Sequence, residues 1–231
     1  MTLISILFTL TAASFVSDPP PLGDYFGFST IDSIKIGDNA GPMYQGDVNG
    51  DGLIDLLIIN NHKSRIDLLL QKQNATPEDT VEVSRANDIP EHWRFDKKRV
   101  MVSHKVSALT LFDFNNDGLT DIVYASNPSN IVFLAQQGDG TFEKERQHRI
   151  RKLHANRSGF AITNIIGNSN PELVTLIDGN IQVLPIDGDA LGKPITFTTE
   201  DRIGWFNLAD YDGNGLNDIA GIAIDSSEPV R

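Results

Sequence analysis

Three short acidic segments of the chain repeat one pattern of oxygen-bearing side chains. Each has Asp or Asn at positions 1, 3 and 5, Gly at position 6, Leu at position 7 and Asp at position 9. The segments are 47–55 (DVNGDGLID), 113–121 (DFNNDGLTD) and 210–218 (DYDGNGLND). Carboxylates this close repel one another unless a cation lies between them. Calcium takes about six to eight oxygen ligands from flexible loops, so the pattern predicts three calcium sites.

The predicted ligands are the side chains at positions 1, 3, 5 and 9 and the backbone carbonyl at position 7. They are Asp47, Asn49, Asp51, Leu53 and Asp55 in the first segment, Asp113, Asn115, Asp117, Leu119 and Asp121 in the second, and Asp210, Asp212, Asn214, Leu216 and Asp218 in the third. The glycine at position 6 permits the sharp reversal of such a loop. Magnesium suits the pattern less, because it demands octahedral geometry and keeps its waters.

An EF-hand loop begins in the same way but has a bidentate Glu at position 12 and helices on both sides. Position 12 here is Ile58, Tyr124 or Gly221, and the flanking residues are strand-like. A fourth, eroded copy covers 164–172 (NIIGNSNPE). It has Ile166 at position 3, which cannot bind a metal, so we expect this copy to keep the turn and to have lost its ion.

The segments that flank the acidic loops have the pattern of β-strands. Residues 107–113 alternate between apolar and polar side chains, and apolar runs such as 122–125 follow the loops. The four copies start at residues 47, 113, 164 and 210, so they are 46 to 66 residues apart. This spacing suits a propeller blade of four strands, roughly 40–50 residues long, with an insertion that we expect within 87–105.

The repeats resemble FG-GAP/VCBS repeats, the units of the integrin α-subunit N-terminal β-propeller and of many bacterial secreted proteins. The resemblance covers about residues 40–224, and the turn 138–142 (GDGTF) is similar to the VCBS pattern. The Gly-Ala-Pro element of the family is reduced to 125–128 (ASNP) in one repeat. The resemblance implies an all-β propeller whose acidic loops join the first and second strands of each blade and bind Ca2+ on one face.

We expect a partial β-propeller of about four repeats over residues 27–231. After Asp218 there is one apolar run, 219–224, so the last blade has two of its four strands. The segment 28–36 is a candidate for one more strand. A partial propeller exposes apolar edges. The hypotheses are therefore that the chain is part of a longer one or that a second chain completes the ring.

The N-terminus predicts export. Residues 3–16 form an apolar run without charges, too short for a membrane-spanning helix, which needs roughly 20 residues. The run fits a signal peptide over 1–17, followed by a proline-rich spacer over 18–26. A buried strand, or the truncated start of a longer chain, is the alternative for the same run. A secreted protein, extracellular or periplasmic, is the interpretation that we favour.

The charge balance excludes several classes of function. With 19 Lys and Arg against 31 Asp and Glu, the formal net charge is −12, which disfavours binding to nucleic acids and to anionic membranes. The chain has no cysteine, so disulfides, thiol nucleophiles and Cys-ligated metals are excluded.

The sequence contains no recognisable catalytic constellation, so a non-enzymatic module that binds an extracellular protein or carbohydrate is the first hypothesis. A carbohydrate-active enzyme, such as a polysaccharide lyase or hydrolase, or its substrate-binding platform, is the second. The basic stretch 144–152 is a candidate site for acidic sugars or a solvated strand. We expect Trp205 and Phe206 to belong to the core of a blade.

Overall fold

The computed structural model describes residues 27, 32–80, 85, 89–167, 170–224 and 226–230. The predicted signal peptide and spacer, 1–17 and 18–26, lie outside the described residues. Tertiary contacts separate residues 1–33 from a second unit, 34–231, which holds all the described secondary structure. The described part of this unit is all-β apart from two short 3-10 turns, Asn61–Lys63 and Pro77–Asp79.

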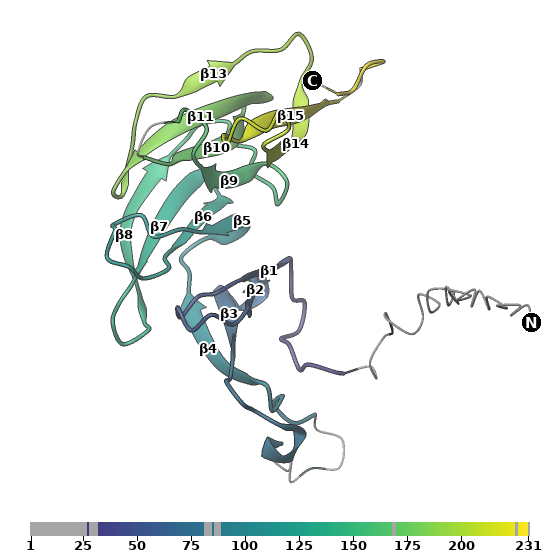
Figure 1. Ribbon diagram of the computed structural model, residues 1–231, viewed down its shortest axis with the longest axis vertical. Helices are drawn as coiled ribbons and strands as arrows, with labels where there is room; N and C mark the ends of the chain where they lie inside the picture. The colour runs from purple at the N-terminus through teal and green to yellow at the C-terminus, as the bar shows by residue number, and fades with distance from the viewer. Residues whose placement is uncertain are drawn as a thin grey trace, which may run out of the picture. The chain divides into compact units, whose positions relative to one another are not determined.

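The strands form four antiparallel sheets, which we call blades 1 to 4 in chain order (Figure 1). Blade 1 consists of β1 (Met43–Gly46), β2 (Asp55–Asn60), β3 (Arg65–Gln71) and β4 (Phe95–Met101). Blade 2 consists of β5 (Lys105–Leu111), β6 (Ile122–Asn127), β7 (Asn130–Gln136) and β8 (Phe142–Arg149). In both blades each strand pairs with the next one along the chain.

The last two blades depart from this order of four strands. Blade 3 consists of β9 (Phe160–Thr163), β10 (Glu172–Ile177), β11 (Asn180–Asp187), β12 (Ala190–Leu191) and β13 (Ile195–Phe197), with β12 and β13 both pairing with β11. Blade 4 consists of β14 (Ile203–Ala209) and β15 (Asp218–Ala223). Beyond β15, Val230 forms an isolated antiparallel bridge with Ile222.

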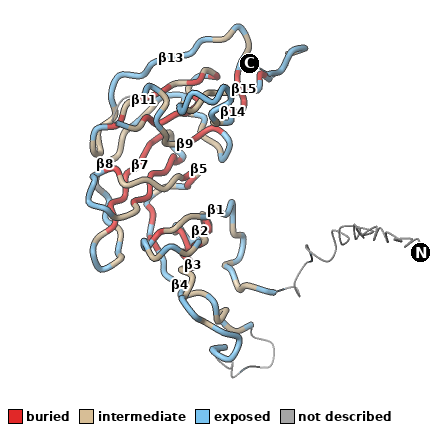
Figure 2. The backbone as a smooth tube through the Cα atoms, viewed as in Figure 1, coloured by how far each residue is buried: buried red, intermediate tan, exposed pale blue. Residues whose placement is uncertain are grey.

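The core lies between successive blades, because the central strands are buried on both faces (Figure 2). One cluster joins blades 1 and 2, through residues such as Ile66 and Tyr124. A second cluster joins blades 2 and 3 around Phe133, and a third joins blades 3 and 4 around Leu176. Strands buried on both faces form continuous apolar runs, and the runs seen in the sequence are the second and third strands of the blades.

The predicted all-β blades are confirmed, and so is the place of the acidic loops between the first and second strands. Two expectations about strands are wrong. Of the strand proposed for 28–36, the described residues 32–36 belong to no strand. The extra length of blade 1 lies in the β3–β4 connection, residues 72–94, and thus begins earlier than the interval 87–105.

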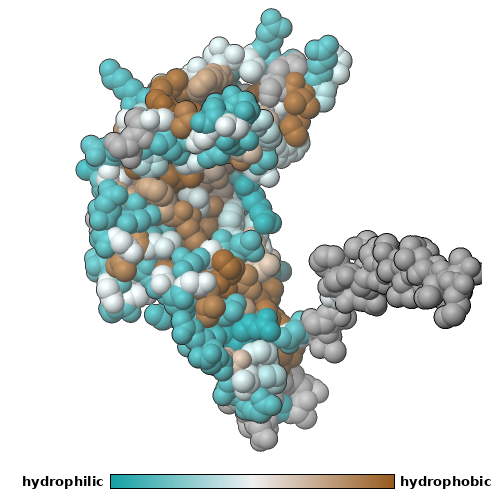
Figure 3. Space-filling model, in the orientation of Figure 1, coloured by the Kyte–Doolittle hydropathy of each residue, from teal (hydrophilic) through white to brown (hydrophobic). Residues whose placement is uncertain are grey.

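The environment of Trp205 was also predicted wrongly. Phe206 is buried as expected, but the Trp205 side chain is 49% exposed. Neighbouring residues of a strand point to opposite faces of the sheet, and among the described residues only the face of blade 4 that carries Phe206 packs against another blade. Apolar surface (brown in Figure 3) gathers where β13 to β15 lie, and Phe197, Trp205 and Ile222 are among the exposed residues there.

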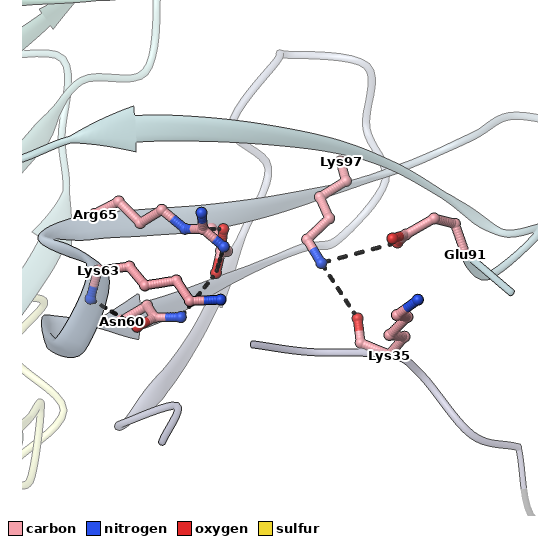
Figure 4. A network of polar contacts seen from close by, with 7 residues as sticks. Lys35, Asn60, Lys63, Arg65, Glu91 and Lys97 are labelled. Carbon is pink, nitrogen blue, oxygen red and sulfur yellow. Dashed lines mark hydrogen bonds and ion pairs between the residues drawn. The ribbon is translucent and has the colours of Figure 1, made fainter. Parts of the chain in front are cut away.

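Blade 1 also contains a buried ion pair (Figure 4). The side chains of Asp67 and Arg65, both on β3, are 1% and 14% exposed. Arg65 Nε lies 2.8 Å from Asp67 Oδ1 as an ion pair, without the geometry of a hydrogen bond. Arg65 Nη2 donates a hydrogen bond to Asp67 Oδ2 at 3.3 Å. Asn60 Nδ2 donates to the same Oδ2 at 3.4 Å. The carboxylate is thus held by one cation and one amide.

We predict that Asp67→Ala lowers the free energy of unfolding by about 3 kcal/mol, because it leaves the Arg65 cation part-buried without a counter-charge. Urea denaturation measures the change. The control is Asp96→Ala on β4. The Asp96 carboxylate is 71% exposed and lies 3.9 Å from Lys72 Nζ, so its loss should cost less than about 1 kcal/mol. Equal losses for the two variants would contradict the prediction.

Candidate calcium loops

The β5–β6 loop is built around the side chain of Asp113, the residue at position 1. Its Oδ1 accepts from the Asp117 N–H at 3.2 Å, and its Oδ2 accepts from the Gly118 N–H at 2.9 Å. Asp117 Oδ1 in turn accepts from the Leu119 N–H at 2.8 Å. Gly118 has a φ of 84°, a value that a residue with a Cβ adopts only at a cost. The glycine at position 6 therefore makes the reversal that was predicted for it.

The β1–β2 loop has the same internal bonds. The carboxylate of Asp47 accepts from the N–H groups of Gly50 (2.7 Å) and Gly52 (2.8 Å). Asp51 Oδ1 accepts from the Leu53 N–H at 2.8 Å. In both loops the Asn at position 3 donates to the Asp at position 5. Asn49 Nδ2 lies 3.0 Å from Asp51 Oδ2, and Asn115 Nδ2 lies 2.9 Å from Asp117 Oδ2. The two loops are copies in geometry as well as in sequence.

The Asp at position 9 has a different environment from the other acids. Asp55 and Asp121 are both 0% exposed. Asp121 Oδ2 accepts from the Phe114 N–H in its own loop at 3.1 Å, and its Oδ1 accepts from the Gln136 N–H at the end of β7 at 2.8 Å. Asp55 makes the same two bonds, to the N–H groups of Val48 (2.9 Å) and Gln71 (2.7 Å). Each of these carboxylates ties its loop to the third strand of its blade.

These two carboxylates are buried without a cationic partner in the described part of the chain. Burial raises the pKa of Asp55, and it raises the pKa of Asp121 to about 6. The backbone N–H bonds lower both pKa values, and the other loop carboxylates raise them further. A carboxyl group whose pKa is higher in the folded state weakens the fold as the pH rises through that pKa. A bound cation favours the ionised form and removes this penalty.

The Gln136 side chain connects two of the loops. With its amide in the orientation that satisfies the neighbouring groups, the nitrogen donates to the carbonyls of Val48 (3.0 Å) and Thr120 (2.9 Å). Val48 belongs to the loop of blade 1 and Thr120 to the loop of blade 2. Sequence reasoning did not find Gln136 or Gln71, because neither belongs to the acidic motif. A Gln at the end of the third strand in both blades was the available signal.

In the β14–β15 loop three carboxylates come together. Single oxygens of Asp210, Asp212 and Asp218 lie within 4.8 Å of one another, the only such trio among the residues that the structure describes. Asp218 Oδ2 accepts from the Tyr211 N–H at 3.0 Å, the counterpart of one bond of Asp121. The counterpart of the second bond, from a third strand, is not formed by the described residues. A hydrogen bond from the Gly215 N–H holds the pKa of Asp210 below its ordinary value.

The eroded β9–β10 loop keeps the tie at position 9. Glu172 is 0% exposed, and its Oε2 accepts from the N–H groups of Ile165 (2.8 Å) and Ile166 (3.3 Å). Its Oε1 is buried without a hydrogen-bond partner. Glu172 is level with Pro185 on β11, and the next N–H, that of Ile186, donates to the Pro171 carbonyl instead. The Ile166 side chain is 45% exposed. In the described part of this loop the Gly167 N–H donates to Asn164 Oδ1 at 2.7 Å, the counterpart of the Gly50 bond to Asp47.

The donor sets of the three intact loops consist of carboxylate, amide and carbonyl oxygens. These are the ligands of a hard cation, and their number and flexible loops suit calcium better than magnesium. Among the described residues, three acid oxygens lie within 4.8 Å of one another only in the fourth blade. In all three loops most carboxylate oxygens accept backbone N–H bonds, as both oxygens of Asp47, Asp113 and Asp210 do. Carboxylate oxygens have further lone pairs, so these bonds leave room for a metal.

The comparison with family models agrees with this arrangement. Residues 113–163 match the model described as FG-GAP-like repeat. The chain contains an FG-GAP-like repeat. The match begins at position 1 of the β5–β6 loop and ends at the last residue of β9, so one repeat covers the loop, three strands of one blade and the first strand of the next. No curated protein matches the sequence.

In the described part of the chain, no helix has the length and apolar character needed to cross a membrane.

Proposed function

We propose that the protein is a secreted, calcium-dependent binding module and not a catalyst. The acidic loops of blades 1, 2 and 4 would each hold one calcium ion through the residues at positions 1, 3, 5, 7 and 9. The β9–β10 loop would hold none. A calcium ion in each of these loops would make the connection between the first and second strands rigid. The rigid loops would form the surface that binds an extracellular protein or carbohydrate.

The observation that carries this proposal is the gathering of Asp210, Asp212 and Asp218. Three carboxylates with oxygens within 4.8 Å of one another form a set of negative ligands that one cation can share. The two other intact loops have the same sequence pattern and the same turn. Extracellular calcium modules bind with dissociation constants of about 0.1–1 mM, a range that matches a loop with three or four acidic ligands and export from the cell.

The test is a calcium titration of the metal-free chain by isothermal calorimetry. We expect about three ions per chain for the wild type and about two for Asp212→Ala, which removes one ligand from the trio. The matched control is Asp139→Ala in the turn between β7 and β8, an exposed acid outside the loops, which should leave the number unchanged. A titration without binding at millimolar calcium would overturn the proposal.

A further inference from the structure

The long β3–β4 connection of blade 1 forms a pocket beside the first acidic loop. The pocket has a volume of about 490 Å³, and its lining includes Leu53 of the loop, Gln71, Lys72 and Gln73 at the end of β3, and Trp93 and Arg94 before β4. In blade 2 the corresponding connection is a tight turn, in which the Gln137 N–H donates to the Thr141 carbonyl at 2.8 Å. The pocket is therefore a product of the insertion.

Two cationic groups line the pocket. The Arg94 guanidinium carbon lies 4.9 Å from the centre of the Trp93 ring, so the aromatic face supports the cation. Arg94 is exposed and has no acidic partner among the described residues. Lys72 is near a single acid, Asp96, at 3.9 Å. An arginine held on a ring presents a fork of N–H groups that matches a carboxylate.

The remaining wall is polar but uncharged. Gln71 and Gln73 contribute amides, which can donate to and accept from hydroxyl groups. Gln73 Nε2 also donates to the Asp51 carbonyl at 3.4 Å, which connects the pocket to the first acidic loop. Leu53 is both a lining residue and the predicted carbonyl ligand of that loop. A change in the loop thus reaches the pocket through two residues.

We propose that this pocket binds a saccharide unit that carries a carboxylate. The carboxylate pairs with Arg94, and the sugar hydroxyls bond to the amides of Gln71 and Gln73. Trp93, which stacks with His92 and supports Arg94, bounds the site. Amides, an aromatic ring and a guanidinium that has no acidic partner among the described residues fit a hydroxylated acid better than an acidic peptide, which offers few hydroxyls. Only the expected dependence of saccharide binding on calcium rests on the proposed function. The assignment of the pocket as a saccharide site does not.

The test compares cellobiouronic acid with cellobiose, two disaccharides that differ in one carboxylate. Binding to the full chain is measured by calorimetry with calcium and with EDTA. We expect the acid to bind and the neutral sugar to bind at least tenfold more weakly. Arg94→Ala should weaken binding of the acid roughly tenfold or more, the loss expected for a charge-assisted hydrogen bond. Arg94→Lys keeps the positive charge but loses the forked pair of N–H donors. Its affinity for the acid should lie between those of the wild type and Arg94→Ala.

The control variant is Arg151→Ala, in the basic stretch 144–152 that the sequence offered as a site for acidic sugars. It should bind the acidic disaccharide as tightly as the wild type does. All variants should bind the same number of calcium ions per chain as the wild type. Equal binding of both disaccharides, unchanged binding by Arg94→Ala, or binding of a Glu-rich peptide in place of the sugar would overturn the proposal. Calcium binding without saccharide binding rejects the pocket alone, whereas saccharide binding without calcium uptake rejects the proposed function alone. Recovery of the intact disaccharide separates binding from catalysis.

Discussion

Replacing Asp121 by Ala is expected to lower the free energy of unfolding by about 3 kcal/mol, even in EDTA. The carboxylate is 0% exposed and accepts the N–H groups of Phe114 (3.1 Å) and Gln136 (2.8 Å). Alanine leaves both donors unsatisfied, at about 1–3 kcal/mol for each buried group. The loss of a charge whose pKa is raised by burial offsets part of this cost. Urea denaturation of the metal-free chain measures the net change.

The equivalent residue of blade 4 is the matched control. Asp218 is at the same position of its loop, but it is only half-buried and accepts one backbone bond, from Tyr211. We expect Asp218→Ala to cost less than about 1 kcal/mol in EDTA and to reduce the number of bound calcium ions by one. Equal losses of unfolding free energy for the two variants in EDTA would contradict this prediction. The hydrogen bond from the Gln136 N–H to Asp121 would then not account for the stability that Asp121 provides.

Calcium is expected to raise the thermal midpoint by roughly 5–10 °C for each occupied loop. An ion that binds only the folded state adds about 2.7 kcal/mol per site when its concentration is a hundredfold above the dissociation constant. For a domain of this size, 1 kcal/mol shifts the midpoint by about 2–4 °C. Thermal unfolding followed by circular dichroism, in EDTA and at increasing calcium, measures the effect.

Magnesium serves as the control in this experiment. It should shift the midpoint much less at equal concentration, because the loops offer oxygen ligands in a flexible arrangement and magnesium keeps its waters. Asp212→Ala, which removes a proposed ligand, should lose the rise in thermal midpoint that one loop provides and retain the rise from the other two loops. A midpoint that is the same in EDTA and in calcium would contradict calcium linkage for all three loops.

The sequence alone determined the repeat and the oxygen-bearing side chains that its loops contain. The spacing of Asp, Asn and Gly located the three loops, and the runs around Ile122 and Ile219 located the strands that follow them. This was possible because both signals are local: a turn with a positive φ at Gly118 requires glycine, and strands buried on both faces form apolar runs. Ile166 likewise marked the eroded copy without knowledge of the fold.

The sequence did not determine which groups outside the motif complete the loops. Gln136 reaches Asp121 because β7 pairs with β6, and its side chain reaches Val48 because two blades pack together. Both contacts join residues that are distant along the chain, so no local pattern shows them. Trp205 was assigned to the core for the same reason: its apolar character is local, but the face on which it lies depends on the pairing of β14 and β15.

The pocket of blade 1 is the strongest case of a feature that only the tertiary structure decided. Spacing showed that blade 1 has extra length, but it placed that length too late in the chain. The Lys72 N–H donates to the Arg94 carbonyl at 2.8 Å, and this bond brings the two ends of the insertion together. Trp93 and Arg94 thereby lie beside Leu53 of the acidic loop. Composition and spacing determine what a loop can bind, whereas chain pairing over long distances determines which loops share a surface.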